Sequence, residues 1–282
     1  MPASQVGADT SRARLQLAIG PMARLGTELA PQGHGRAFAA EDRHGAALLV
    51  TFFDPPPAGP DLPSLDQRLA SLRTAAHRAI VVPIAAGAID GRTWQIEIAP
   101  RGVTVRERLV TGPVGIGQGI GVLRDLARAL VTLHRRGVAH GAITLDTVRV
   151  VGNGGVLYGA GGAVAVASVR GDLDALGRVI WALLTGETEP DSNRRLSDYR
   201  RGVPPALDVL CAGLLDGVPE RRPRRAGAIL DALDLVPTRR FSPLAAIVDA
   251  GSHDVRSPRR AGWALVAAAV LVVGALVALS LR

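Results

Sequence analysis

The side chains available for chemistry are restricted in this sequence, because none of its 282 residues is a lysine and all 33 Lys or Arg side chains are arginine. A phosphate-cradling P-loop, a Schiff-base enzyme and a Ser-x-x-Lys hydrolase each need a lysine amine at the reacting centre. The sequence therefore excludes these three classes in their usual form.

Cysteine and aromatic residues are scarce as well. Cys211 is the only cysteine, which excludes an internal disulfide framework and a multi-cysteine metal site and fits a reducing compartment. We expect Cys211 to be a small core residue. The net charge of +8 suggests nucleic acid, but the arginines are scattered and only 3% of the residues are aromatic. Without a set of stacking side chains, we expect no nucleic-acid partner.

Three short motifs follow one another in the second half of the chain. A Leu-His-x-x-Gly-x-x-His turn spans 133–140, an Asp followed by Leu-Gly and Leu-Leu-x-Gly spans 172–186, and Pro-x-x-Arg-Pro spans 219–223. In this order and at these spacings, the motifs resemble the bacterial, actinobacterial-type Ser/Thr protein-kinase family. The resemblance covers about 25–235 and implies a kinase-like fold.

The same resemblance implies that the catalytic positions have lost their chemistry. In the family's His-Arg-Asp-x-Lys-x-x-Asn loop, Asp accepts the substrate proton, Lys touches the transferred phosphate and Asn holds magnesium. When the family motif is aligned without gaps from His140, these three positions are Ala142, Thr144 and Thr147. Continued further, the alignment places the first residue of the magnesium-binding Asp-Phe-Gly triplet at Ala160. A hard dication needs oxygen ligands, so we expect no metal, no cofactor and no catalysis.

The nucleotide-binding positions of the N-terminal part are degenerate too. In the family's Gly-x-Gly-x-x-Gly loop, Ala30 and Gln32 replace the first two glycines and Gly35 keeps the third. The strand lysine aligns with Thr51. The alanine that packs on adenine aligns with Leu49, whose larger side chain should occupy part of the pocket. The resemblance therefore implies weak or no ATP binding.

The family's long activation segment is nearly deleted, because only residues 163–171 separate the triplet position from Asp172. We expect Asp172 to accept backbone N–H bonds from the turn near His140, a structural role that survives without catalysis. His140 is likewise expected to stabilise the fold. Arg222, whose family partner lay in the deleted segment, should pair with another acid or face solvent.

Hydrophobic periodicity indicates which elements must position these residues. We expect short strands over 25–50, with 48–50 buried, a helix over 63–77, and strands over 80–84 and 93–98. Further helices are expected over 122–134, 173–184, 206–215 and 226–235. A sheet-rich first third and a helical remainder predict an α+β, bilobal, protein-kinase-like fold. The N-lobe would span 21–99 and the C-lobe 100–235.

The two ends of the chain are expected to lie outside this fold. Residues 1–20 are predicted to form an N-terminal tail with one short helix at 11–19. Residues 236–260 are rich in Pro, Ser and Arg and are predicted to form a juxtamembrane linker.

Residues 261–281 carry no charge and would span roughly 31 Å as a helix at 1.5 Å per residue, which matches a bilayer core. They predict a transmembrane helix, for which a buried core helix is the weaker alternative. Arg256, Arg259 and Arg260 precede this segment and only Arg282 follows it. The predicted location is therefore a single-pass cell-membrane protein with 1–260 cytoplasmic and the C-terminus external.

Together these features predict a catalytically inactive, membrane-anchored pseudokinase that acts as a cytoplasmic scaffold or regulatory adaptor in cell-envelope regulation. Its plan is similar to the pseudokinase region associated with the lipid II flippase. The membrane and other proteins would be its partners. These include a true kinase that phosphorylates Thr238 and a phosphopeptide-reading protein that this recruits.

Two alternatives remain open at this point. The first is a nucleotide-binding sensor without turnover, which would use Gly35 and the hinge near 97–99. The second is a non-orthodox phosphotransferase that uses Glu97, Asp146 or Asp172.

Overall fold

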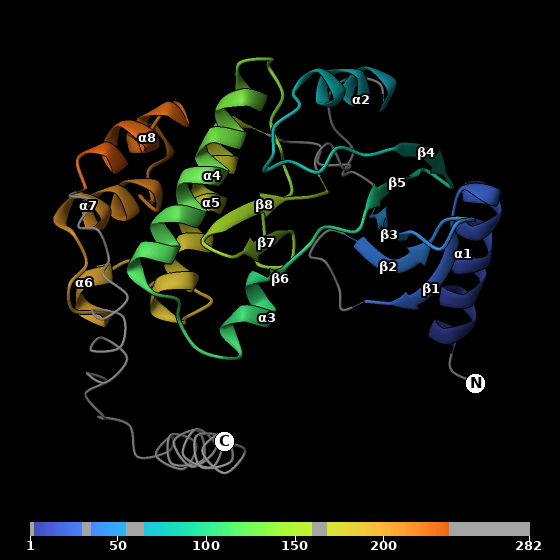
Figure 1. The fold of residues 1–282 in the computed structure, drawn as a ribbon, viewed down its shortest axis with the longest axis horizontal. Helices are drawn as coiled ribbons and strands as arrows, with labels where there is room; N and C mark the ends of the chain where they lie inside the picture. The colour runs from blue at the N-terminus through green and yellow to red at the C-terminus, as the bar shows by residue number, and fades with distance from the viewer. Residues whose placement is uncertain (1–2, 30–34, 55–64, 160–167, 237–282) are drawn as a thin grey trace, which may run out of the picture. The chain divides into compact units, whose positions relative to one another are not determined.

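The chain folds into an antiparallel sheet, the N-lobe, followed by a mainly helical C-lobe, as the computed structural model shows (Figure 1). The structure describes residues 3–29, 35–54, 65–159 and 168–236. The prediction of a bilobal α+β fold is confirmed.

Five antiparallel strands form the N-lobe sheet in the order β1-β2-β3-β5-β4. The strands are β1 (Arg24–Glu28), β2 (Gly35–Glu41), β3 (Ala47–Phe53), β4 (Ala85–Ile89) and β5 (Arg92–Ile98). Because side chains alternate along a strand, β3 sends Leu48, Val50 and Phe52 into one core cluster, whereas Leu49 belongs to a second cluster with Tyr158. The sheet is therefore buried on both faces.

A 17-residue helix, α1 (Ala3–Ile19), covers the first of these faces. Its Leu15 and Ile19 are fully buried in the same cluster as the side chains of β3. The Gln16 side chain joins α1 to the chain before β1, because its Nε2 donates to Ala23 O (3.0 Å) and its Oε1 accepts from Leu25 N (2.8 Å). The predicted tail over 1–20 is thus corrected, since this segment completes the N-lobe core.

The C-lobe is built around α4 (Ile116–His134) and α5 (Val169–Thr185). Its other elements are the helices α3 (Val105–Leu109), α6 (Leu196–Tyr199), α7 (Pro205–Leu214) and α8 (Gly227–Asp234), the 3-10 turn η2 (Pro219–Arg221), and the sheet β6 (Val103–Thr104), β7 (Val148–Val151) and β8 (Gly154–Leu157). A second 3-10 turn, η1 (Gly20–Met22), follows α1, and α2 (Leu65–Thr74) connects β3 to β4.

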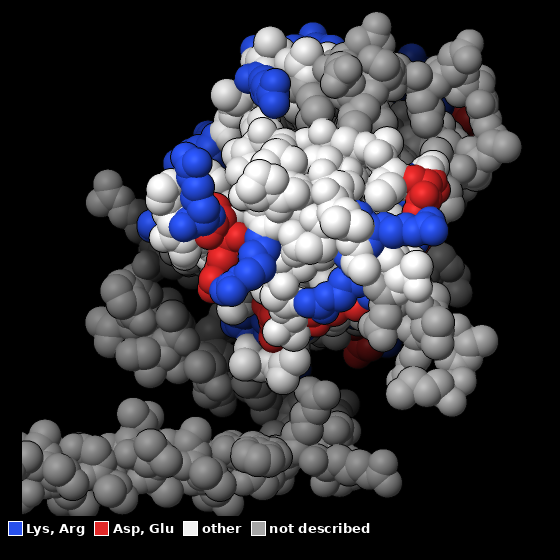
Figure 2. Space-filling view, turned by 90° about the vertical axis from the view of Figure 1, so that its right-hand side faces the viewer, with Lys and Arg blue, Asp and Glu red and all other residues white. Residues whose placement is uncertain are grey.

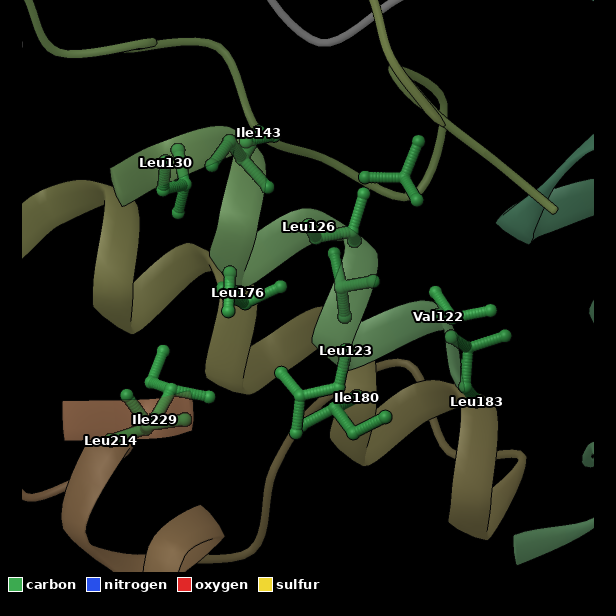
Figure 3. Packing of buried hydrophobic residues seen from close by; sticks show 14 of the residues in the cluster. Val122, Leu123, Leu126, Leu130, Ile143, Leu176, Ile180, Leu183, Leu214 and Ile229 are labelled. Carbon is green, nitrogen blue, oxygen red and sulfur yellow. The ribbon is translucent and has the colours of Figure 1, made fainter. Parts of the chain in front are cut away.

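Apolar side chains from four helices interlock in the C-lobe core (Figure 3). The labelled members are Val122, Leu123, Leu126 and Leu130 of α4, Ile143 of the loop that follows α4, Leu176, Ile180 and Leu183 of α5, Leu214 of α7, and Ile229 of α8. The periodic apolar positions that predicted these helices are the positions that pack here.

One predicted strand is wrong: residues 80–84 do not form it, and β4 begins at Ala85. The backbone before β4 pairs instead with the end of β8, where Leu157 N donates to Ala79 O (2.9 Å) and Val81 N donates to Leu157 O (2.8 Å). This apolar run therefore joins the two lobes.

Several predicted features lie outside the described residues, namely Ala30, Gln32, Ala160, Thr238, the linker beyond Val236 and the segment 261–281. Among the helices that the structure describes, none has the length and apolar character needed to cross a bilayer.

The packing of α1 predicts a large difference between two neighbouring leucines. Leu15→Ala should lower the free energy of unfolding by about 2–5 kcal/mol, because it leaves a cavity in the N-lobe core. Leu17→Ala is the matched control, since Leu17 is 81% exposed and surface changes usually stay within about 0.5 kcal/mol. Thermal unfolding of both variants is the measurement, and equal midpoints would contradict the packing of α1.

Candidate functional site

The loop that follows α4 holds the positions where the family has its catalytic side chains. Ala142 is buried, and its carbonyl accepts a hydrogen bond from Thr147 Oγ1. Thr147 Oγ1 also accepts from Thr144 N (2.8 Å), and Thr144 Oγ1 accepts from Thr147 N (3.1 Å). Both threonine hydroxyls thus bind the backbone of their own loop, and Ala142 offers no group that could accept a proton.

Asp172 lies in the first turn of α5 and holds the start of this loop. Its Oδ2 accepts from His140 N and its Oδ1 from Gly141 N, both at 2.8 Å. The Nε2 of His134, the last residue of α4, also lies 2.8 Å from Asp172 Oδ2. Asp172 is buried, and its carboxylate is occupied by these three neighbours.

His140 is fully enclosed beside Asp172. Burial lowers the pKa of its imidazole to about 4, against the opposing effect of the Asp172 charge. Its Nδ1 accepts from Ala142 N (3.3 Å). At neutral pH the ring is therefore uncharged and supports the turn.

Asp146 is the acidic side chain nearest in sequence to the aligned positions Ala142, Thr144 and Thr147, but it is held by Arg106. The guanidinium donates in bidentate fashion, with Nε to Oδ1 at 2.7 Å and a terminal nitrogen to Oδ2 at 2.9 Å. Such a pair fixes both carboxylate oxygens. No pattern in the sequence indicates this partner, which lies 40 residues away in the chain.

Arg222 has an acidic partner other than the one it would have in the family. One terminal nitrogen lies 3.4 Å from Asp174 Oδ1, and Nε donates to Asp216 O at 2.7 Å. Asp174 also pairs with Arg178 at 3.2 Å. Arg222 thereby ties the chain after α7 to the second turn of α5.

The sheet face that turns toward the C-lobe carries the positions expected for nucleotide. Leu49 is buried there with Ala37 and Tyr158, and Leu29 and Val81 pack against them. Ala37 stands two residues after Gly35, where the kinase motif has a valine next to its Gly-rich loop. Apolar side chains of the chain itself therefore occupy the face against which a nucleotide base would pack.

Tyr158 is a residue of this site that the sequence patterns did not single out. Its ring belongs to the cluster with Leu49, and its hydroxyl donates to the backbone carbonyl of Asp146. Tyr158 stands two residues before Ala160 in the sequence. Its large aromatic side chain next to the expected metal-binding position is the feature that could have pointed to it. Tyr158 closes the space between the N-lobe sheet and the catalytic-loop region.

The surroundings of Thr51 and Gly35, two further positions expected to contact nucleotide, are set by the packing of the sheet. Thr51 is buried, and its Oγ1 has no hydrogen-bond partner among the residues that the structure describes. A Cβ on Gly35 would lie 2.3 Å from Phe52 O, so the close pairing of β2 with β3 explains this glycine without a phosphate.

Glu97, at the end of β5, links the lobes. It is fully buried, and its Oε1 accepts from Gly159 N at 2.9 Å. Burial raises the pKa of this carboxyl to about 8, although the Gly159 bond opposes the shift. Its Oε2 has no partner in the described part of the chain. Glu97 is therefore mainly protonated at pH 7.

Solved structures of one kinase domain are similar to this chain. A variant of the Mycobacterium tuberculosis PknI kinase domain has a TM-score of 0.57 at 16% identity and covers 76% of this chain and 94% of that chain. A double mutant has a TM-score of 0.57 at 17% identity, with coverages of 76% and 95%. No family model and no curated protein matches the sequence. The likeness shows a protein-kinase-like fold.

The burial of Glu97 predicts a pH-dependent effect of Glu97→Gln. The carboxyl has a pKa of about 8 in the folded chain against the ordinary 4.5, so the folded state keeps a proton that the unfolded state releases between these values. The folded wild type therefore loses stability as the pH rises through this window. Glutamine retains an acceptor for Gly159 N without this loss.

The variant should have a higher unfolding midpoint than the wild type at pH 8, with the difference shrinking toward pH 4. Thermal unfolding from pH 4 to 9 measures this. Glu41→Gln, at an exposed strand position, is the control and should show no comparable trend. A difference that is the same at every pH would contradict the burial of an ionisable group.

Proposed function

We propose that this chain is a catalytically inactive pseudokinase that works as a scaffold or regulatory adaptor. The observation that carries the proposal is the occupied sheet face, where Leu49 and Tyr158 fill the expected base-binding position. The lack of lysine removes the usual phosphate-pairing amine at Thr51. The function then depends on surfaces that bind other proteins.

The former catalytic loop supports the same proposal. Ala142 cannot orient a nucleophile, and the nearby Asp146 is engaged by Arg106. Asp172 accepts its hydrogen bonds from the backbone of the turn. A non-orthodox phosphotransferase that uses Asp146 or Asp172 is not favoured, because these two carboxylates already have structural partners.

A nucleotide sensor without turnover is the second candidate, and one observation favours it. Thr51 Oγ1 and Glu97 Oε2 are buried without partners among the described residues, and both stand on strands beside the Leu49 cluster. Buried polar atoms normally have a partner. A ligand that displaced Tyr158 would gain two polar contacts there.

The proposal predicts that the purified full chain shows no thermal shift with 1 mM ATP, with or without magnesium, and no turnover of labelled ATP. A site filled to a hundredfold excess over Kd would stabilise the chain by about 2.7 kcal/mol, which is readily measured. A shift that does not need metal would support the sensor instead. Turnover would overturn both. Thr51→Lys combined with Ala160→Asp should not create turnover, because Ala142 remains.

The proposal includes a membrane anchor at 261–281 with residues 1–260 in the cytoplasm and the C-terminus outside. It is supported by the uncharged sequence and by the arginines before it. A periplasm-active reporter fused after Arg282 should be active, and a cytoplasm-active one should not. The reverse result would contradict this orientation.

Phosphorylation of Thr238 by a true kinase, followed by capture of a phosphopeptide-reading protein, is the regulatory part of the proposal. Added negative charge beside Arg239 and Arg240 would create the binding motif. Pull-down after co-expression with such a kinase should recover the reader with wild type and lose it with Thr238→Ala. Equal recovery would eliminate this part.

A further inference from the structure

A cavity of about 450 Å³ lies in the C-lobe, where it is lined by residues of α5, α7 and the loop that leads to α6. These three helices contact one another (Figure 1). The buried residues of the lining include Trp181 and Cys211, and the half-buried Leu215 belongs to the same lining. Burial raises the pKa of the Cys211 thiol to about 12, so this side chain stays uncharged. The cavity thus has an apolar floor and the volume of a small-ligand site, which is roughly 300–1,000 Å³.

Opposite charges line this cavity without pairing with each other. Three arginines and three aspartates belong to the lining, namely Arg178, Arg194, Arg195, Asp191, Asp208 and Asp216. All six lie in the described part of the chain, and no ion pair there joins one of these arginines to one of these aspartates. Arg178 pairs instead with Asp174 at 3.2 Å and with Glu189 at 3.7 Å, which are not part of the lining. The lining charges therefore stand apart, and a ligand between them would complete their pairing.

A cavity of similar volume in the N-lobe is arranged differently. Its lining includes Arg24 and Glu41, which lie 3.4 Å apart and form an ion pair. On the N-lobe side of the molecule, which Figure 2 shows, arginines lie next to acidic side chains around a large uncharged area. Opposite charges of the N-lobe cavity thus partly neutralise each other, whereas no such pair joins the described lining residues of the C-lobe cavity.

The three aspartates of the C-lobe cavity differ in the bonds that they already make. Asp208 is buried, and its two oxygens accept from Ser197 N at 3.2 Å and from Ser197 Oγ at 2.7 Å. Asp191 and Asp216 each accept one backbone N–H bond at Oδ1, at 2.9 and 2.8 Å. The Oδ2 atoms of Asp191 and Asp216 accept from no residue that the structure describes. Two carboxylate oxygens of the lining are therefore available to an ammonium group.

Donors of the same lining are available as well. The Arg194 guanidinium lies 4.1 Å from the centroid of the Tyr199 ring, and Arg195 is exposed. Neither arginine has an ion-pair partner among the residues that the structure describes. Nε1 of Trp181 is buried and has no hydrogen-bond partner in the described part of the chain, although buried donors normally have one. The lining thus combines an apolar floor with spare acceptors and spare donors.

We propose that the C-lobe cavity binds a free α-amino acid with a large apolar side chain. Its ammonium group pairs with Asp191 and Asp216, and its carboxylate pairs with Arg194 and Arg195. Its side chain packs on the floor beside Trp181. A zwitterion carries both charges in one molecule and matches a lining of three arginines and three aspartates. An anion or a cation would each meet like charges, which are costly at close range. This inference does not depend on the proposed loss of catalysis.

The test is isothermal titration of the purified full chain with L-leucine, L-leucine methyl ester and N-acetyl-L-leucine, and with L-phenylalanine. The ester lacks the carboxylate charge, and the acetyl derivative lacks the ammonium charge. L-leucine should bind at least about tenfold more tightly than either derivative, because each derivative leaves one set of lining charges without a partner. Equal affinity for L-leucine and both derivatives would overturn the proposal. So would the absence of binding of both L-leucine and L-phenylalanine at about 10 mM, which exceeds the Kd of even a weak, roughly millimolar site.

Two double variants assign the two ends of the ligand. Arg194→Gln with Arg195→Gln should abolish the preference for L-leucine over its methyl ester and keep the preference over N-acetyl-L-leucine. Asp191→Asn with Asp216→Asn should do the reverse, and asparagine retains an acceptor for the backbone N–H bonds at these positions. Each preference is a ratio measured within one variant, so it does not depend on the folded fraction. Ratios that stay at the wild-type value in both variants would overturn the proposal.

The matched control makes the same chemical changes at the N-lobe cavity, whose lining includes Asp42 and Arg43. Asp42→Asn with Arg43→Gln should leave all affinities unchanged. A control that loses the same preferences would show a general effect of charge and would overturn the proposal. Tighter binding of a leucine peptide blocked at both ends than of free L-leucine would also overturn it, since the cavity would then dock a peptide.

Discussion

The buried carboxylate of Asp172 is the interaction on which the arrangement of the helical lobe depends. An ionised group removed from water is costly unless hydrogen bonds replace its hydration. Here the replacements come from His140 N, Gly141 N and the His134 ring. These donors belong to the end of α4 and to the next loop, so one side chain of α5 fixes both. Losing one partner of such a group typically costs about 3–5 kcal/mol.

The fixed loop in turn determines how the two lobes meet. It presents the Asp146 carbonyl to the Tyr158 hydroxyl, and the Tyr158 ring packs on Leu49 of the sheet. The Glu97 carboxyl adds a bond to Gly159 N, and the backbone of Leu157 pairs with Ala79 and Val81. Opening the lobes would break these contacts together and would expose a buried tyrosine. The interlobe space is therefore a packed joint.

The sequence predicted the parts that depend on local pattern and missed the parts that depend on distant contacts. The apolar periodicity of 122–134 and 173–184 predicted helices that the structure contains as α4 and α5, because those positions form the core. The segment 1–20 lacked a long apolar stripe, so the burial of Leu15 and Ile19 against the sheet could not be anticipated. The pairing of Arg106 with Asp146 and the packing of Tyr158 on Leu49 join residues far apart in the chain, and single-sequence patterns carry no information on such pairs.

The candidate site separates the residues that hold the kinase-like fold from those at the positions that align with kinase catalytic residues. The polar groups that hold the fold, Asp172 with its turn and Arg222 with Asp174, are distinct from the positions that would bind magnesium and phosphate. A charged side chain at the buried positions Ala142 or Thr147 would have to be desolvated, at a cost of several kcal/mol. Ala142 avoids that cost, and Thr144 and Thr147 satisfy backbone groups of their own loop. The residues at these aligned positions are thus compatible with the packed joint between the lobes.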